Sequence, residues 1–166
     1  MATNAVVLVG FMGAGKTSVG KLLAGRLGVP FVDTDTLVES RTGRRIADIF
    51  KREGEAAFRV LETETLAALA PKPAVYATGG GIVTTPENWP LMKRLGTVVH
   101  LHGSAEVLFA RVAHETHRPL LNTANPRDTF AHLLQTRDAL YRQADVTVRT
   151  DGRTPAQIVD DICKKI

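Results

Sequence analysis

A glycine-rich motif near the start of the chain constrains its fold more than any other feature. Residues 10–17 read GFMGAGKT, which matches the pattern G-x-x-x-x-G-K-[ST] and directly follows the apolar run at 5–9. Glycines let a chain wrap tightly with its N–H groups turned inward, and the N-terminus of a following helix adds partial positive charge. A loop between a strand and a helix with this pattern binds the phosphates of a nucleoside triphosphate with Mg²⁺. The alternative is a chance match in a glycine-rich turn, and the flanking apolar patterns argue against it.

Two side chains of the motif carry the chemistry that such a loop needs. Lys16 supplies a mobile cation for the β- and γ-phosphates, and the Thr17 hydroxyl is a ligand that suits Mg²⁺. The next residues place apolar side chains at helical spacing, namely Val19, Leu22, Leu23 and Leu27. This spacing predicts an amphipathic helix after the loop, as the phosphate-binding interpretation requires.

Strand and helix patterns alternate along the rest of the chain. Short apolar runs predict strands near 5–9, 31–34, 74–78, 97–101 and 146–149. Longer periodic stretches predict helices near 15–27, 35–70 (interrupted near 42–43 and 54), 86–95, 104–114, 127–143 and from 154 onward. This order predicts one α/β domain over 1–166, a three-layer sandwich with a five-stranded parallel sheet and ligands at the carboxyl ends of the strands. The segments 34–62 and 112–125 are insertions on this pattern, and the second has the composition of a mobile lid.

Two aspartates follow the second expected strand. Asp33 and Asp35 lie at the sheet edge where the phosphate loop is also expected. The third and fourth expected strands do not end in an aspartate, so Asp33 is our candidate for the metal carboxylate, acting through Mg²⁺-bound water. Asp35 is a candidate to accept a proton or a hydrogen bond from a substrate hydroxyl. The alternative is that both cap the next helix, although capping explains only one of them.

Three arginines and a glycine triplet are further candidates. Arginine binds carboxylate and phosphate oxygens in a bidentate manner, which singles out Arg59, Arg118 and Arg137. Each of them taken alone also fits a solvated surface. The run TGGG at 78–81 ends the third expected strand and permits a ligand to approach the backbone closely, with an ordinary turn as the alternative.

Composition argues against several classes of function. The net charge is +4, but the basic residues are scattered and only 5% of the residues are aromatic, so we expect no nucleic-acid partner. No apolar run approaches a membrane-spanning length, and the first strand begins too early for a signal peptide, so we expect no membrane association. Cys163 is the only cysteine, which leaves no intramolecular disulfide and favours a cytoplasmic location.

Four motifs together resemble the shikimate kinases. They are GFMGAGKT, the run from FVDTD at 31–35 to Glu62, TGGG at 78–81 and RPLL at 118–121, in the order and at spacings compatible with that family over almost the whole chain. The resemblance implies a P-loop kinase fold with a lid and a helical substrate-binding insertion. It also implies a monomer that transfers a phosphoryl group from ATP, with Mg²⁺, to the 3-hydroxyl of shikimate, a step toward chorismate and the aromatic amino acids.

The same resemblance implies roles for individual residues. Asp35 matches the residue that contacts shikimate hydroxyls and acts as the base, and Arg59 and Arg137 match the pair that binds the shikimate carboxylate. Arg118 matches the lid arginine that closes over the transferring phosphoryl group, and with Lys16 and Asp35 it makes up the expected catalytic set. Further shikimate contacts are implied for Gly80, Phe50 and Phe58. The implied nucleotide contacts are Gly13, Ala14, Gly15, Lys16, Thr17, Ser18, Arg111, Arg118 and Arg153.

Other interpretations stay open at this point. Gluconate kinases and nucleoside monophosphate kinases share the architecture, although the F-R-x-x-E run at 58–62 and TGGG argue against both. A nucleotide-dependent switch or an inactive binding module is an interpretation from another class. The sequence has no N-K-x-D guanine-binding motif and retains Lys16, Asp35 and Arg118, so we expect an enzyme.

Overall fold

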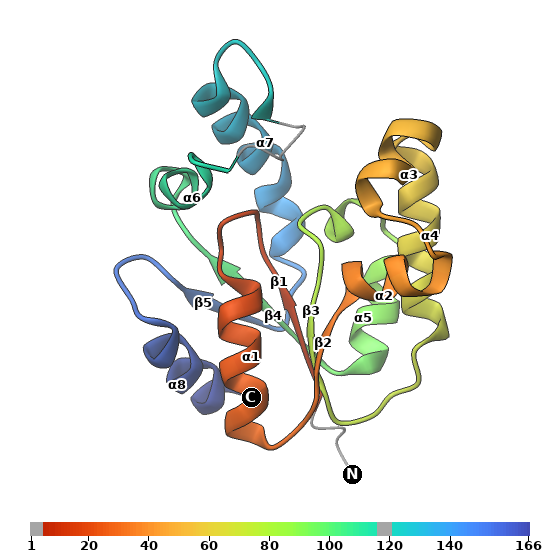
Figure 1. Ribbon diagram of the computed structural model, residues 1–166. Helices are drawn as coiled ribbons and strands as arrows, with labels where there is room; N and C mark the ends of the chain where they lie inside the picture. The colour runs from red at the N-terminus through yellow and green to blue at the C-terminus, as the bar shows by residue number, and fades with distance from the viewer. Residues whose placement is uncertain (1–4, 116–120) are drawn as a thin grey trace.

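A parallel sheet of five strands forms the centre of the computed structural model, which describes residues 5–115 and 121–166 (Figure 1). The strands are β1 (Val6–Val9), β2 (Phe31–Asp33), β3 (Val75–Ala77), β4 (Thr97–His102) and β5 (Val146–Arg149), in the spatial order β2-β3-β1-β4-β5. β1 is central, because Val7 pairs with Tyr76 of β3 on one side and with Val98 of β4 on the other. The five predicted strands and their parallel arrangement are confirmed.

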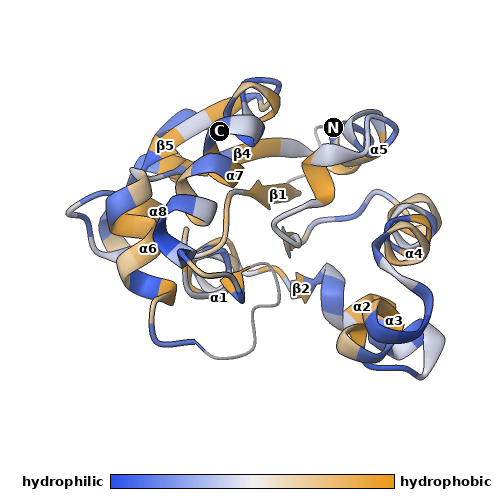
Figure 2. Ribbon diagram, turned by 90° about the horizontal axis from the view of Figure 1, so that it is seen from above, coloured by the Kyte–Doolittle hydropathy of each residue, from blue (hydrophilic) through white to orange (hydrophobic). Residues whose placement is uncertain are grey.

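Helices cover both faces of the sheet, so the molecule has the predicted three layers (Figures 1 and 2). On one face α1 (Lys16–Leu27) packs beside α8 (Pro155–Lys165), and α5 (Asn88–Leu95) and α7 (Pro126–Tyr141) lie on the other. α6 (Ala105–Val112) packs against α7. A group of three helices, α2 (Thr34–Thr42), α3 (Ile46–Glu53) and α4 (Glu55–Ala68), stands beyond the β2 edge. The short 3₁₀ helix η1 (Ile82–Thr84) after the glycine triplet was not predicted.

Apolar side chains fill the space between the layers. All four residues of β1 are buried, because a parallel sheet covered on both faces hides every side chain of its central strand. Figure 2 shows hydrophobic strands at the centre and hydrophilic residues on the outer sides of the helices. In α1, Val19 and Leu23 are buried in the core, whereas Leu22, at the margin of the same helix face, is 43% exposed. Across the described residues, we find no helix with both the length and the apolar character needed to cross a membrane.

The segment 34–62 packs around a small core of its own. Val38, Ile49 and Phe58, one from each helix of the group, are buried together in a cluster separate from the main core. The two predicted interruptions are confirmed as helix ends, at Gly43 with φ 66° and at Gly54 with φ 87°. Glycine adopts such angles without steric cost, so the chain turns sharply at both places and the three helices fold back on one another. The group therefore forms a compact wall beside the carboxyl end of β2.

Candidate active site

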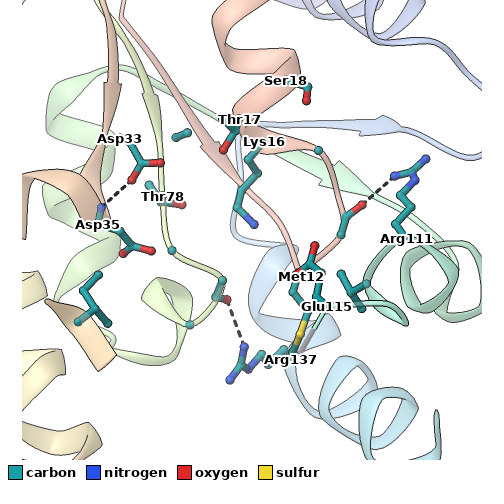
Figure 3. Close-up of a pocket in the computed structure, with 18 of the residues that line it drawn as sticks. Met12, Lys16, Thr17, Ser18, Asp33, Asp35, Thr78, Arg111, Glu115 and Arg137 are labelled. Carbon is teal, nitrogen blue, oxygen red and sulfur yellow. Dashed lines mark hydrogen bonds between the residues drawn. The ribbon is translucent and has the colours of Figure 1, made fainter. Parts of the chain in front are cut away.

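A cavity of about 630 Å³ opens at the carboxyl ends of the strands, between the phosphate loop and the α2–α4 group (Figure 3). Most of the predicted site residues line it, although they come from segments far apart in the sequence. Those that do are Gly13, Gly15, Lys16, Thr17, Ser18, Asp33, Asp35, Phe50, Phe58, Arg59, Gly80, Arg111 and Arg137. The cavity therefore contains both the phosphate-binding and the substrate-binding candidates.

The phosphate loop curves around the amino group of Lys16. Lys16 Nζ donates hydrogen bonds to the carbonyl oxygens of Gly10 (2.5 Å) and Phe11 (3.2 Å), so the ammonium group lies inside the loop. Helix α1 begins at Lys16, and its first N–H groups and positive end face the same place. Arg111 of α6 donates to the carbonyl oxygen of Gly13 (2.9 Å) and fastens α6 to the loop. This geometry suits an anionic ligand with several phosphate oxygens.

Asp33 serves as the N-cap of α2 through one carboxylate oxygen, Oδ1, which leaves Oδ2 for another partner. Its Oδ1 accepts hydrogen bonds from the backbone N–H groups of Asp35 (2.9 Å) and Thr36 (3.2 Å), so the capping alternative is correct for this residue. No hydrogen bond from a described residue reaches its Oδ2. The Thr17 side chain points toward Asp33 across the cavity (Figure 3). One hydroxyl and one carboxylate suit Mg²⁺, which keeps several waters and takes phosphate oxygens as its other ligands.

Asp35 does not cap the helix, and its carboxylate points into the cavity (Figure 3). Its Oδ1 is buried, and none of the described residues donates a hydrogen bond to it. Burial and the neighbouring Asp33 carboxylate raise the pKa of Asp35 to about 6, although Lys16 and Arg59 act in the opposite direction. A carboxyl group with a raised pKa and a free buried oxygen is suited to accept a proton from a ligand hydroxyl.

Arg59 is held by two carboxylates of its own helix. Its Nη1 contacts Glu62 Oε1 at 2.9 Å, and its Nη2 contacts Glu55 Oε1 at 3.1 Å. Glu62 is almost fully buried, and burial raises its pKa to about 7 against the lowering effect of Arg59. The second oxygen of Glu62, Oε2, has no hydrogen-bond partner among the described residues. The pair thus fixes the guanidinium at the cavity wall, where Phe50 and Phe58 lie with ring centroids 5.0 Å apart.

The glycine triplet makes room for these charged side chains. A Cβ atom at Gly79 would lie 2.9 Å from Asp35 Oδ1 and 3.1 Å from Glu62 Oε2. A Cβ at Gly81 would overlap the guanidinium of Arg59, which would have to move. A side chain at Gly79 or Gly81 would therefore displace the charged groups that lie against the triplet. The run also forms a turn, in which the Ile82 N–H donates to the Gly79 carbonyl oxygen at 3.2 Å.

Arg137 enters the cavity from the opposite side, on α7 (Figure 3). The residue is only 8% exposed, and its Nη1 donates to the carbonyl oxygen of Gly80 (3.3 Å). Its guanidinium also lies 5.4 Å from the centroid of the Phe11 ring. Arg59 and Arg137 thus line one cavity from two separate helices, as two groups that bind one carboxylate must.

Three predicted site residues are not among those that line the cavity. Ala14 is buried within the phosphate loop and does not line the cavity. Arg153, in the turn before α8, contacts Asp161 Oδ2 at 2.8 Å instead. Arg118 lies outside the described residues, as does most of the RPLL motif. The nucleotide contacts assigned to these three positions stay predictions.

Sequence reasoning missed three residues that the structure places at the site. Glu62 is buried because it continues the inward stripe of α4 one turn after Phe58, a spacing visible in the sequence. Tyr141 lies one turn after Arg137 and donates a hydrogen bond to the same Gly80 carbonyl (3.2 Å). Glu115 lines the cavity near the phosphate loop, and no motif pointed to it.

Comparisons with known proteins agree with this geometry. The family model for shikimate kinase matches residues 12–166. The shikimate kinase of Thermodesulfovibrio yellowstonii is 45% identical over 161 residues, which cover 96% of this chain and 93% of that protein. The shikimate kinase of Pseudomonas fluorescens is 46% identical over 163 residues, which cover 97% of this chain and 95% of that protein.

Among solved structures, a shikimate kinase is similar to this chain in both sequence and fold. A shikimate kinase from Acinetobacter baumannii in complex with shikimate is 40% identical with a TM-score of 0.91, and the match covers 98% of this chain and 92% of that one. A gluconokinase from Sinorhizobium meliloti is 23% identical with a TM-score of 0.53, over 97% and 90% of the two chains, a likeness that extends to the fold alone. The resemblance inferred from the four motifs is therefore confirmed, and the chain belongs to the shikimate kinase family.

Proposed function

We propose that this chain transfers the γ-phosphoryl group of ATP to the 3-hydroxyl of shikimate, giving shikimate 3-phosphate and ADP on the route to chorismate and the aromatic amino acids. The observation that carries the proposal is that one cavity holds the phosphate loop, the half-buried Asp35 carboxylate and two arginines. Membership of the family and the likeness to a structure that contains shikimate support the choice of acceptor.

The acceptor is bound by its carboxylate and aligned by its ring. Arg59 and Arg137 hold the carboxylate from two sides, and Phe50 and Phe58 flank the ring. No described residue accepts a hydrogen bond from the Gly80 N–H, which leaves it able to donate to the ligand. Binding one end of a small molecule at two fixed cations sets the position of its hydroxyl groups, and correct placement is much of what this reaction requires.

Asp35 takes the proton of the 3-hydroxyl while the oxygen of that hydroxyl attacks the γ-phosphorus. A new oxygen–phosphorus bond forms, and the bond from the γ-phosphorus to the bridging oxygen of ADP breaks. Lys16 and the lid residue Arg118 stabilise the charge on the phosphoryl oxygens. We assign the remaining nucleotide contacts to the loop residues Gly13 to Ser18, and to Arg111 and Arg153 near the adenine.

Mg²⁺ is the metal that this donor set fits; Thr17 would hold it directly and Asp33 would hold it through water. Bound there, it would neutralise phosphate charge during transfer. We further propose that residues 1–166 act as one kinase domain, with 34–62 as the substrate-binding segment and 112–125 as a lid that excludes water. Under this proposal the chain works as a cytoplasmic monomer, which light scattering of the purified protein checks.

The test is a coupled assay of ADP release with Mg²⁺ and one of four additions: shikimate, gluconate, AMP or no acceptor. We expect turnover with shikimate alone. Turnover with gluconate or AMP instead would keep the phosphate-loop chemistry and overturn the acceptor assignment. A folded protein that binds ATP but is silent with every acceptor would show a non-enzymatic module.

A further inference from the structure

The carbonyl group of Gly80 is the meeting point of two side chains from α7. Arg137 Nη1 donates to it at 3.3 Å, and the Tyr141 hydroxyl donates to it at 3.2 Å. The two donors are four residues apart and therefore lie on one face of the helix, one turn from each other. A single backbone oxygen thus ties the glycine triplet to α7 at the place where Arg137 enters the cavity.

Backbone hydrogen bonds hold the carbonyl groups on either side of Gly80, because Ile82 N–H donates to Gly79 (3.2 Å) and Thr84 N–H donates to Gly81 (3.1 Å). Neither of these bonds involves the Gly80 carbonyl itself. An added Cβ at Gly80 would meet no atom closer than 3.7 Å, in contrast to the tight fit at Gly79 and Gly81. A glycine in open space is free to turn its peptide planes, because no side chain restricts its backbone angles. The orientation of the Gly80 carbonyl therefore depends on its hydrogen bonds.

Tyr141 is itself rigidly held. Its ring is 1% exposed and stacks on the imidazole of His100 in β4, with centroids 4.5 Å apart and planes 6° apart. Burial lowers the pKa of His100 to about 4, so this partner stays neutral near pH 7. A buried ring packed flat on the central sheet gives its hydroxyl a fixed position, which the long and flexible side chain of Arg137 lacks.

We propose that Tyr141 is a positioning residue, whose hydroxyl fixes the Gly80 carbonyl and, through that shared acceptor, the orientation in which Arg137 binds the carboxylate of the acceptor substrate. The proposal rests on the proposed function, because it assumes that Arg137 binds that carboxylate. Tyr141 has no place in the phosphoryl transfer itself, so its loss should weaken binding of the acceptor and leave the chemical step nearly unchanged.

The central test is Tyr141→Phe, which keeps the ring on His100 and removes only the hydroxyl. We expect the KM for shikimate to rise about fivefold, the effect of losing one buried hydrogen bond. The KM for ATP and kcat should stay within about twofold of the wild-type values. Tyr76→Phe is the matched control, because Tyr76 is also fully buried, does not line the cavity, and its hydroxyl has no partner among the described residues.

A second readout follows the peptide group itself. The Gly81 amide belongs to the same peptide plane as the Gly80 carbonyl, so its ¹H–¹⁵N signal should move in Tyr141→Phe and stay in place in Tyr76→Phe. An unmoved signal, or an unchanged KM for shikimate, would overturn the proposal. An equal fall of kcat with every substrate, together with a lower Tm, would show a merely structural role and would overturn it as well.

Arg137→Ala separates the positioning role of Tyr141 from the carboxylate-binding role of Arg137. If Tyr141 acts through Arg137, adding Tyr141→Phe to Arg137→Ala should change the KM for shikimate less than about twofold. A full fivefold effect in the double variant would show that Tyr141 acts without Arg137 and would overturn the proposal. If Arg137→Ala alone leaves the KM for shikimate unchanged, the assignment of the carboxylate to Arg137 is wrong, whatever Tyr141→Phe does.

Discussion

Asp35 and Glu62 are two carboxyl groups, the first half-buried and the second buried, that approach the same point above Gly79. Burial is the largest cause of the raised pKa of each, about 6 for Asp35 and about 7 for Glu62. Ionising either group in the folded protein therefore costs free energy that ionising it in the unfolded chain does not. At the scale of single residues, the site gives up stability to keep a proton acceptor beside the phosphate loop.

Replacing Asp35 by Asn tests this cost directly. We expect turnover to be lost and the free energy of unfolding at pH 7 to rise by roughly 1–2 kcal/mol, because the folded protein no longer holds an ionised carboxylate that is partly removed from water. The folded-state pKa of Asp35 is above its unfolded value of 3.8, so the gain should shrink as the pH falls from 7 toward 4. Urea unfolding at several pH values measures this gain in the free energy of unfolding. An Asp35→Asn protein that is less stable than the wild type at pH 7 would contradict the expectation.

The pH profile of the wild-type enzyme carries the same information. Asp35 accepts a proton only when it is ionised, and its pKa is about 6. We therefore expect kcat/KM for shikimate to rise with pH through about 6 and to level off above about 7. A profile that is flat from pH 5 to pH 8 would argue that Asp35 is not the proton acceptor.

Close packing of whole elements gives the glycine triplet its role. The turn between β3 and η1 lies against α4, and Arg59 occupies the space that a side chain at Gly81 would need. Gly81→Ala should displace Arg59 and raise the KM for shikimate at least tenfold, while the KM for ATP changes little, because the phosphate loop lies on the other side of the cavity. Gly25→Ala in α1 is the control, since a Cβ there meets no atom within 4 Å. Steady-state kinetics of the two variants decide the point, and equal KM values for shikimate would count against the close-approach argument.

Helix α2 poses the question of whether Asp33 is more than a cap. Asparagine caps a helix about as well as aspartate, whereas alanine costs about 1 kcal/mol. Asp33→Asn should therefore keep wild-type stability but need more Mg²⁺ for half-maximal activity. Asp33→Ala should be less stable and should also need more Mg²⁺. Thermal unfolding and Mg²⁺ titration of the two variants measure this. An unchanged Mg²⁺ requirement in Asp33→Asn would leave Asp33 as a cap alone.

At the scale of the whole molecule, the two substrates stabilise the fold through different walls of one cavity. A ligand at about 100 times its Kd adds about 2.7 kcal/mol to the free energy of unfolding, which raises Tm by roughly 5–10 °C in a chain of this length. Lys16→Met should lose the rise produced by ATP and keep the rise produced by shikimate, and Arg137→Ala should do the reverse. Differential scanning fluorimetry tests the crossed pattern. Loss of both responses in either variant would show that the two subsites are not separate.

The sequence by itself determined the class of fold, the phosphate loop and the family, because each depends on short-range patterns. The alternation of apolar strands with periodic helices predicts a covered parallel sheet, and GFMGAGKT places a phosphate loop after its first strand. The ends of α2 and α3 at Gly43 and Gly54 were also predictable, since glycine is the residue that adopts the backbone angles required there.

Only the tertiary structure decided which side chains meet in the site. The order β2-β3-β1-β4-β5 places Asp35, Gly80 and Arg137 around one cavity, although no spacing in the sequence encodes their approach. It likewise placed the Tyr141 hydroxyl on Gly80 and turned Arg153 toward Asp161. Burial and contact between distant segments depend on how elements pack, and the same packing raises the pKa of Asp35, a property that no local pattern contains.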